Sequence, residues 1–184
     1  HPLPPRCARV ASPLEGEEAL ILASVAAGTV TAFGETMPAQ FGRAGAIPAA
    51  AKREGDGATP LGTWPIRAAL LRRDRVAALA TALPWRWLRR DDGWCDAPAD
   101  PHYNRPVQLP YRASAEAMWR DDGAYDVVLV LGHNDAPPLP GLGSAIFWHC
   151  SEGRPTAGCI AMEREVLLRW LGRMVPGDAV TIVA

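Results

Sequence analysis

The sequence of 184 residues has no apolar run long enough to cross a membrane and almost no net charge. Its longest apolar runs, 19–27 and 127–131, fall well short of the ~20 residues that a membrane-spanning helix needs. The formal net charge is −1 at pH 7, and acidic residues interrupt or follow the short arginine-rich stretches at 72–75 and 86–90. We therefore expect neither a membrane span nor a nucleic-acid-binding surface.

Cysteine is scarce and irregularly spaced, at positions 7, 95, 150 and 159. Four such residues do not make a disulfide framework, and the sequence has no Cys-x-x-Cys or His-x₃-His pair of the kind that structural zinc sites contain. We expect no metal and no cofactor. One disulfide among Cys7, Cys95 and Cys150 and three separate thiols both remain open.

Internal repeats and low-complexity tracts are also absent, and the balance of 48% hydrophobic and 21% charged residues is typical of an ordinary globular protein. The prolines within residues 1–13 predict an extended lead-in, and residues 14–184 fit one domain. The chain begins with His1 rather than Met, so we expect a mature or trimmed form without its signal peptide.

Short apolar runs separated by Gly/Pro turns predict a mainly β domain. The expected strands are a hairpin of 19–27 and 29–33, then 63–71, 125–132 and 178–183. Helical patterns occupy 114–120, with Ser114 as N-cap, and 163–174. The segments 34–62 and 91–110 are rich in glycine and proline and predict loops.

A histidine and a cysteine stand at either end of a Gly/Pro loop. His149 ends a short apolar run and Cys159 precedes the second helical pattern, so a folded-back loop must bring them together. An imidazole can take the proton of a thiol, and a nearby helix N-terminus favours the thiolate. Gly158 lets the backbone approach an acyl group closely, and the N–H groups of Gly158 and Cys159 are candidate oxyanion donors.

The residues around this pair carry a family likeness. Ser144 to His149 and Pro155 to Cys159 resemble the catalytic segment of the L,D-transpeptidase (YkuD) family. The likeness extends over residues 40–184, because further segments fit in the same order: 41–45, 52–64, 94–98, 103–107, 125–128 and 133–134. The commoner family signature has His before the Gly-Cys and Arg two residues after it, whereas this chain has Ala157 and Ala161 there. We interpret the chain as a member of a divergent branch.

The resemblance implies a YkuD-like β-sandwich with a few short helices and a single catalytic domain over 14–184. It also implies that Cys159 attacks a stem-peptide carbonyl, that His149 is the base, and that a backbone carbonyl near Cys150 orients the imidazole. The partners implied are donor and acceptor stem peptides of peptidoglycan, with carbapenems as covalent inhibitors. The location implied is periplasmic or at the cell wall.

Candidate substrate-binding residues come from two places. Tyr103 and Asn104 are polar residues in the 91–110 loop that we expect to line a cleft, and His133 is either a cleft residue or a structural hydrogen-bonding group. By the resemblance, the residues flanking the reacting pair are also assigned to substrate binding: Ser144, Trp148, Thr156 and Ala157.

Three other functions remain open. Water in place of an acceptor amine would make the same acyl-enzyme an L,D-carboxypeptidase. A non-catalytic wall-binding module would stack sugars on Trp64, Trp85, Trp87 and Trp148. A cysteine peptidase of unrelated fold is the third. The sequence does not decide between cross-link types.

Overall fold

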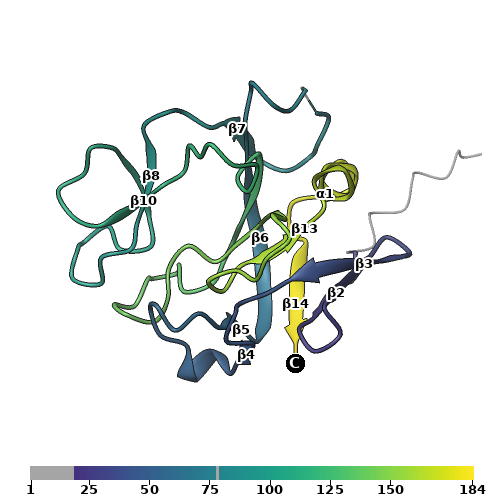
Figure 1. Cartoon of the computed structure of the whole chain (residues 1–184), viewed down its shortest axis with the longest axis horizontal. Coiled ribbons are helices and arrows are strands. Elements are labelled where there is room, and N and C mark those ends of the chain that lie inside the picture. The colour runs from purple at the N-terminus through teal and green to yellow at the C-terminus, as the bar shows by residue number, and fades with distance from the viewer. Residues whose placement is uncertain (1–18, 78) are drawn as a thin grey trace, which may run out of the picture.

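A computed structural model describes residues 19–77 and 79–184, so the expected lead-in at 1–13 lies outside the described residues. The described chain is mainly β, as expected (Figure 1). Its elements are β1 Ile21–Ser24, β2 Thr29–Ala32, β3 Glu35–Gln40, β4 Ala46–Ile47, the 3₁₀ turn Ala49–Ala51, β5 Thr59–Pro60, β6 Gly62–Leu71, β7 Trp85–Trp87, β8 Asp92–Cys95, β9 Pro106–Gln108, β10 Ala115–Ala117, β11 Val127–Leu131, β12 Phe147–Cys150, β13 Ile160–Met162, α1 Arg164–Leu171 and β14 Ala179–Val183.

The main sheet closes on itself. Its order is β11-β12-β13-β3-β2-β1-β14-β6-β7, and β11 also pairs with β6, which completes a ring. The ten-residue strand β6 makes this possible, because its first half pairs with β14 and its second half with β11. A closed sheet leaves few unpaired strand edges. Two small sheets, β10-β8-β9 and β4-β5, lie outside the ring.

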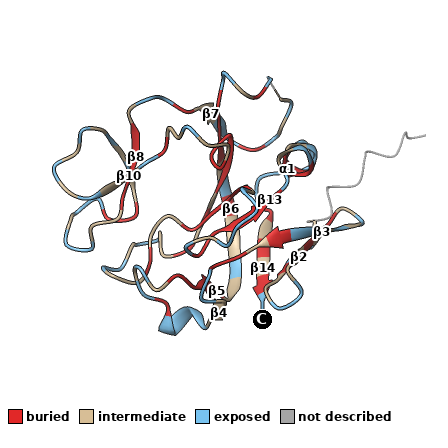
Figure 2. Cartoon of the chain, viewed as in Figure 1, coloured by how far each residue is buried: buried red, intermediate tan, exposed pale blue. Residues whose placement is uncertain are grey.

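Side chains from every strand of the ring fill its interior, and one face of α1 joins them through Val166, Leu167 and Trp170. A second, smaller cluster forms on the outer side of β11 and β12, where Phe147 joins Trp94 of β8 and Met118, which directly follows β10. In Figure 1 the small sheet with β8 and β10 stands apart from the ring. In Figure 2 the strands of the ring contain many of the buried residues. Among the described residues, no helix has the length and apolarity needed to cross a bilayer.

The structure confirms the expected hairpin, the strands at 63–71, 125–132 and 178–183, and the helix within 163–174. The helix expected at 114–120 is wrong, because β10 occupies this position and pairs with β8. Met118 is buried in the outer cluster. A segment this short is a marginal helix in isolation, so pairing and burial decide its conformation.

The two expected loops are also partly strands. β3, β4 and β5 lie within 34–62, and β8 and β9 within 91–110. β3 joins the main ring between β2 and β13, although it contains Pro38. Glycine and proline counts therefore overestimated the irregular structure in both segments.

Candidate active site

His149 and Cys159 lie on the same face of two neighbouring strands. β12 and β13 pair in parallel with His149 opposite Ala161, and residues opposite each other or two apart share a face. Cys159, two residues before Ala161, therefore falls beside Phe147. The Phe147 N–H donates to Cys159 Sγ at 3.3 Å, in agreement with this register.

A backbone carbonyl orients the imidazole of His149. Its Nδ1 lies 2.8 Å from the carbonyl oxygen of Cys150, at the place that the family resemblance implies. A carbonyl can only accept, so Nδ1 carries the proton and Nε2 is left as the basic nitrogen. The ring of Tyr125 packs edge-on against the imidazole, with 5.2 Å between centroids. Burial lowers the pKa of His149 to about 4, although the bond to Cys150 opposes the shift.

The thiol of Cys159 is neutral at rest. Its Sγ donates to the carbonyl of Ala145 at 3.2 Å, and the residue is only 8% exposed. Burial raises its pKa to about 12, against the smaller effect of the Phe147 N–H. No hydrogen bond joins His149 to Cys159 in the described chain. Proton transfer therefore requires the sulfur to turn from Ala145 towards the imidazole.

Hydrogen bonds made by Thr156 hold the loop before Cys159 in place. Thr156 exchanges backbone hydrogen bonds with Phe41 and Arg43, at 2.8 and 2.9 Å. Its hydroxyl donates to the carbonyl of Cys159 at 2.7 Å and accepts from the Gly158 N–H at 3.1 Å. Gly158 has φ of +141°, and a Cβ there would lie 2.8 Å from the carbonyl oxygen of Ala58. The glycine is required by its own backbone packing, and its N–H is already engaged.

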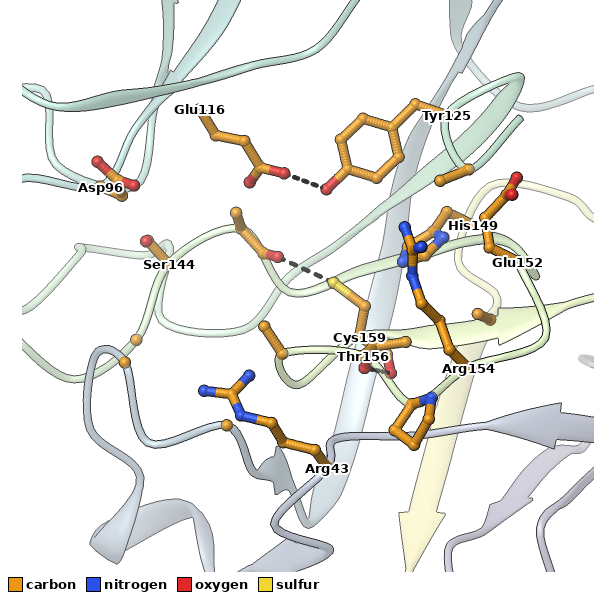
Figure 3. Close-up of a pocket in the computed structure, with 18 of the residues that line it drawn as sticks. Arg43, Asp96, Glu116, Tyr125, Ser144, His149, Glu152, Arg154, Thr156 and Cys159 are labelled. Carbon is orange, nitrogen blue, oxygen red and sulfur yellow. Dashed lines mark hydrogen bonds between the residues drawn. The ribbon is translucent and has the colours of Figure 1, made fainter. Parts of the chain in front are cut away.

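A cavity of about 360 Å³ opens over His149 and Cys159 (Figure 3). His149 and Cys159 line it together with side chains from segments far apart in the sequence. The charged lining residues are Arg43, Lys52, Glu54, Asp96, Glu116, Arg120, Glu152 and Arg154. The site is therefore a polar groove with a thiol and an imidazole at its wall.

Several of these charged side chains already have partners within the domain. Lys52 is buried and forms an ion pair with Asp56, and Arg120 forms one with Asp122 at 2.6 Å. Glu54 accepts hydrogen bonds from Tyr103 and Ser144. The cavity wall is thus fixed by internal contacts before any ligand arrives.

Comparison with known proteins places the chain in a family. The model of the YkuD family, described as L,D-transpeptidase catalytic domain, matches residues 20–182. The chain belongs to this family. No curated protein matches the sequence. The expected β fold and the suspected resemblance are both confirmed.

Similar solved structures include three mycobacterial L,D-transpeptidases. L,D-transpeptidase 1 from Mycobacterium tuberculosis is 15% identical over 92% of this chain and 60% of its own, with a TM-score of 0.43. L,D-transpeptidase 3 from the same organism, with a faropenem-derived adduct, is 16% identical over 91% and 60%, with a TM-score of 0.44. An L,D-transpeptidase from Mycobacterium smegmatis is 17% identical over 91% and 59%, with a TM-score of 0.39. The chain spans about 60% of the length of these proteins.

Within this L,D-transpeptidase domain, three of the expected substrate-binding residues line the cavity: Ser144, Thr156 and Ala157. Ser144 donates to Glu54 Oε2 at 2.8 Å. Ala157 stands where the commoner signature has histidine, so this wall carries a methyl group in place of an imidazole.

Tyr103 and Asn104 act behind the cavity wall. The Tyr103 hydroxyl donates to Glu54 and accepts from the Gly143 N–H at 3.0 Å. Asn104 is buried, and its amide bonds to Ala145 N–H and to the carbonyl groups of His133 and Asn134. Neither residue is among those that line the cavity. Both hold the 143–145 segment, so their expected direct contact with substrate is replaced by support of the wall.

His133 and Trp148 are also placed away from the cavity lining. His133 is 4% exposed and packs edge-on against Trp64, with 4.8 Å between centroids. Burial lowers its pKa to about 4, so it is neutral. Trp148 is fully buried inside the ring, on the opposite face of β12 from His149. It cannot reach a ligand in the cavity, and its assignment to substrate binding is corrected to core packing.

The cysteines other than Cys159 have no access to the cavity. Cys95, Cys150 and Cys159 are free thiols, so the alternative of a Cys95–Cys150 disulfide is wrong. Pairings with Cys7 lie outside the described residues. The Cys150 side chain points into the ring and only its carbonyl serves His149. Among the residues described, no group of three or more His, Cys, Asp or Glu could hold a metal ion.

The expected contribution of the helix dipole is also corrected. β13 separates Cys159 from α1, and the buried face of α1 packs into the ring interior rather than the outer cluster that holds Cys159. The dipole effect is confined to the first turn, so α1 does not act on the thiol.

The lining residues that the sequence did not single out include Glu54, Glu116 and Tyr125. Glu54 lies in a segment that resembles the family. The nearby Asp-Gly sequence is typical of a tight turn, so no role in the site was predicted for Glu54. Glu116 was assigned to a helix. Tyr125 was assigned to the buried strand, although its hydroxyl reaches Glu116.

Proposed function

We propose that this domain is a peptidoglycan L,D-transpeptidase that works through a thioester on Cys159. Family membership and the shared face of His149 and Cys159 above one cavity support the proposal. The single observation that carries it is the His149 Nδ1 bond to the Cys150 carbonyl, because this bond turns Nε2 into the base.

In the acylation step, a donor stem peptide enters the cavity and the thiol leaves Ala145. His149 Nε2 takes the thiol proton as sulfur attacks the peptide carbonyl. The Cys159 N–H donates to the developing oxyanion, since the Gly158 N–H is bonded to Thr156. The carbon–nitrogen bond breaks, and the leaving amine receives the proton from the imidazolium.

In the second step, an acceptor amine attacks the thioester and the carbon–sulfur bond breaks, while His149 takes a proton from the attacking amine and passes it to sulfur. Water in the same position gives the L,D-carboxypeptidase product, which is the second candidate function. Both reactions use peptidoglycan stem peptides, so we place the domain outside the cytoplasmic membrane, in the periplasm or at the cell wall.

Incubation with disaccharide-tetrapeptide, followed by mass analysis of the muropeptides, tests the proposal. We expect cross-linked dimers with the unaltered domain and none with Cys159→Ala. Cys95→Ala is the matched control, since it removes a buried thiol that does not line the cavity and should keep the activity. Muropeptides that stay unchanged with the folded unaltered domain would contradict the function.

A further inference from the structure

The cavity gathers carboxylates on the side where the small outer sheet meets it. Glu116 of β10 and Asp96, just after β8, both line the cavity, and Figure 3 shows them above Cys159 with Arg43 on the opposite side. Glu152, another acidic residue of the lining, stands apart, beside His149 and Arg154. A ligand thus meets Glu116 and Asp96 together.

Glu116 is held in place but keeps an acceptor oxygen. The buried Tyr125 hydroxyl donates to Glu116 Oε1, and no hydrogen bond to Oε2 is present in the described chain. Asp96 Oδ1 is buried with no partner among the described residues, whereas the unpartnered Glu116 Oε2 is accessible from the cavity. Buried carboxylate oxygens normally have a donor, so Asp96 Oδ1 points to a ligand that brings N–H groups, and the same ligand can reach Glu116 Oε2.

The charge of Glu116 opposes the first half of the proposed reaction. After burial and the Phe147 N–H, the negative charge of Glu116 is the next largest influence on the pKa of Cys159, and it raises that pKa. A carboxylate near the thiol disfavours the thiolate. The charge of Glu116 therefore does not favour the thiolate that acylation needs, and this carboxylate fits a later step better.

The second half of the reaction does need a carboxylate. An acceptor amine arrives as an ammonium ion, and it must lose one proton before its nitrogen can attack the thioester. Burial raises the pKa of Glu116, which makes it a better proton acceptor than an ordinary carboxylate. His149 supplies the proton for sulfur, so a separate group is needed for the first ammonium proton.

We propose that Glu116, positioned by Tyr125, binds the acceptor ammonium and takes its first proton. This inference rests on the proposed function. The ammonium gives one proton to the carboxylate, the amine nitrogen forms the amide bond, and the carbon–sulfur bond breaks. The second amine proton passes through His149 to Cys159 Sγ, and Glu116 then releases its proton to water.

The two half-reactions separate this role from folding and from acylation. With disaccharide-tetrapeptide as both donor and acceptor, we expect Glu116→Gln to form the acyl-enzyme within twofold of the unaltered rate, measured by intact mass. The ratio of dimer to hydrolysed product should fall at least tenfold. Glu165→Gln, a charge-matched change on the exposed face of α1, should leave both values unchanged.

A neutral nucleophile provides the second readout. Hydroxylamine is largely unprotonated at neutral pH and needs no ammonium-binding group. The Glu116→Gln acyl-enzyme should therefore react with hydroxylamine as fast as the unaltered one. Tyr125→Phe keeps the aromatic ring at position 125 and the carboxylate of Glu116, but it removes the hydrogen bond that positions this carboxylate. It should also lower the ratio of dimer to hydrolysed product, by a smaller factor than Glu116→Gln. This variant keeps the test open if Glu116→Gln does not fold.

Three results would overturn the assignment. An unchanged dimer ratio in both variants removes the role of Glu116. Equal losses of dimer and hydrolysed product make it a base for any nucleophile rather than an amine-binding group. A loss of acylation in parallel with the dimer places it in the first half-reaction. Failure of the unaltered domain to form any acyl-enzyme would instead overturn the proposed function, and this role with it.

Discussion

The two faces of the β12–β13 pair differ in what covers them, although both are buried. Cys150 points into the closed ring, and Cys159 borders the cavity on the outer face. Burial raises the pKa of both thiols to about 12. The resting charge state therefore does not distinguish a nucleophile from a packed thiol in this domain. Cys159 differs from Cys150 because it lines the cavity and lies on the same face of the strand pair as the imidazole of His149.

The largest expected effect is covalent labelling of one cysteine. We expect imipenem to add to Cys159 and to no other described cysteine, because only Cys159 lines the cavity. Intact mass and peptide mapping should find one adduct in the unaltered domain and in Cys95→Ala, and none in Cys159→Ala. An adduct that maps to Cys150 would break the comparison between the two faces.

Removal of the base should slow the reaction without unfolding the domain. We expect His149→Gln to reduce the rate of acylation by about 10² to 10⁴, the range typical of general acid–base catalysis. Stopped-flow or quench-flow mass analysis gives the rate, and circular dichroism checks the fold. Acylation within threefold of the unaltered rate would mean that another group accepts the thiol proton.

The pH dependence of alkylation tests the resting state. Because the pKa of Cys159 is raised to about 12, the thiolate fraction should grow about tenfold per pH unit between about pH 6 and about pH 9. The rate of reaction with iodoacetamide should rise in the same proportion, with no plateau. A plateau near neutral pH would reveal a preformed thiolate–imidazolium pair and contradict the neutral ground state.

A substitution on the face of β12 that points into the ring should change the stability of the domain rather than its reaction. Trp148→Ala removes a fully buried ring from the closed sheet and should lower the free energy of unfolding by about 3 to 5 kcal/mol. Ser144→Ala on the cavity side removes one hydrogen bond and should cost about 1 kcal/mol. Urea titrations measure both. A small cost for Trp148→Ala, together with weaker binding to peptidoglycan, would favour the sugar-stacking alternative.

Patterns within single segments of the sequence predicted several of the strands and the one α-helix of the described chain. The hairpin, β6 and β11 are marked by apolar runs and α1 by a helical repeat, each within one segment, and His149 and Cys159 lie at the two ends of one short loop. The face of Trp148 was not predictable in this way. All four residues of β12 are buried, because clusters cover both sides of the strand, so the alternation that marks a face is missing.

Long-range pairing determines the rest of the site. Glu116 reaches the cavity only because β10 pairs with β8, with Glu116 opposite Trp94. A short segment with good helix formers gave no sign of this pairing. Asn104 was recognised as a polar loop residue, but its partners lie about 30 and 40 positions away, and only the tertiary fold shows that it supports the wall.

The position of Lys52 determines which amines the surface of the described domain exposes. It is the only lysine in the sequence, and it is buried in an ion pair with Asp56. The remaining basic side chains, apart from histidine, are guanidinium groups, which do not act as acyl acceptors at neutral pH because they stay protonated. A domain that forms the proposed thioester therefore offers its neighbours no lysine amine to which they could become attached.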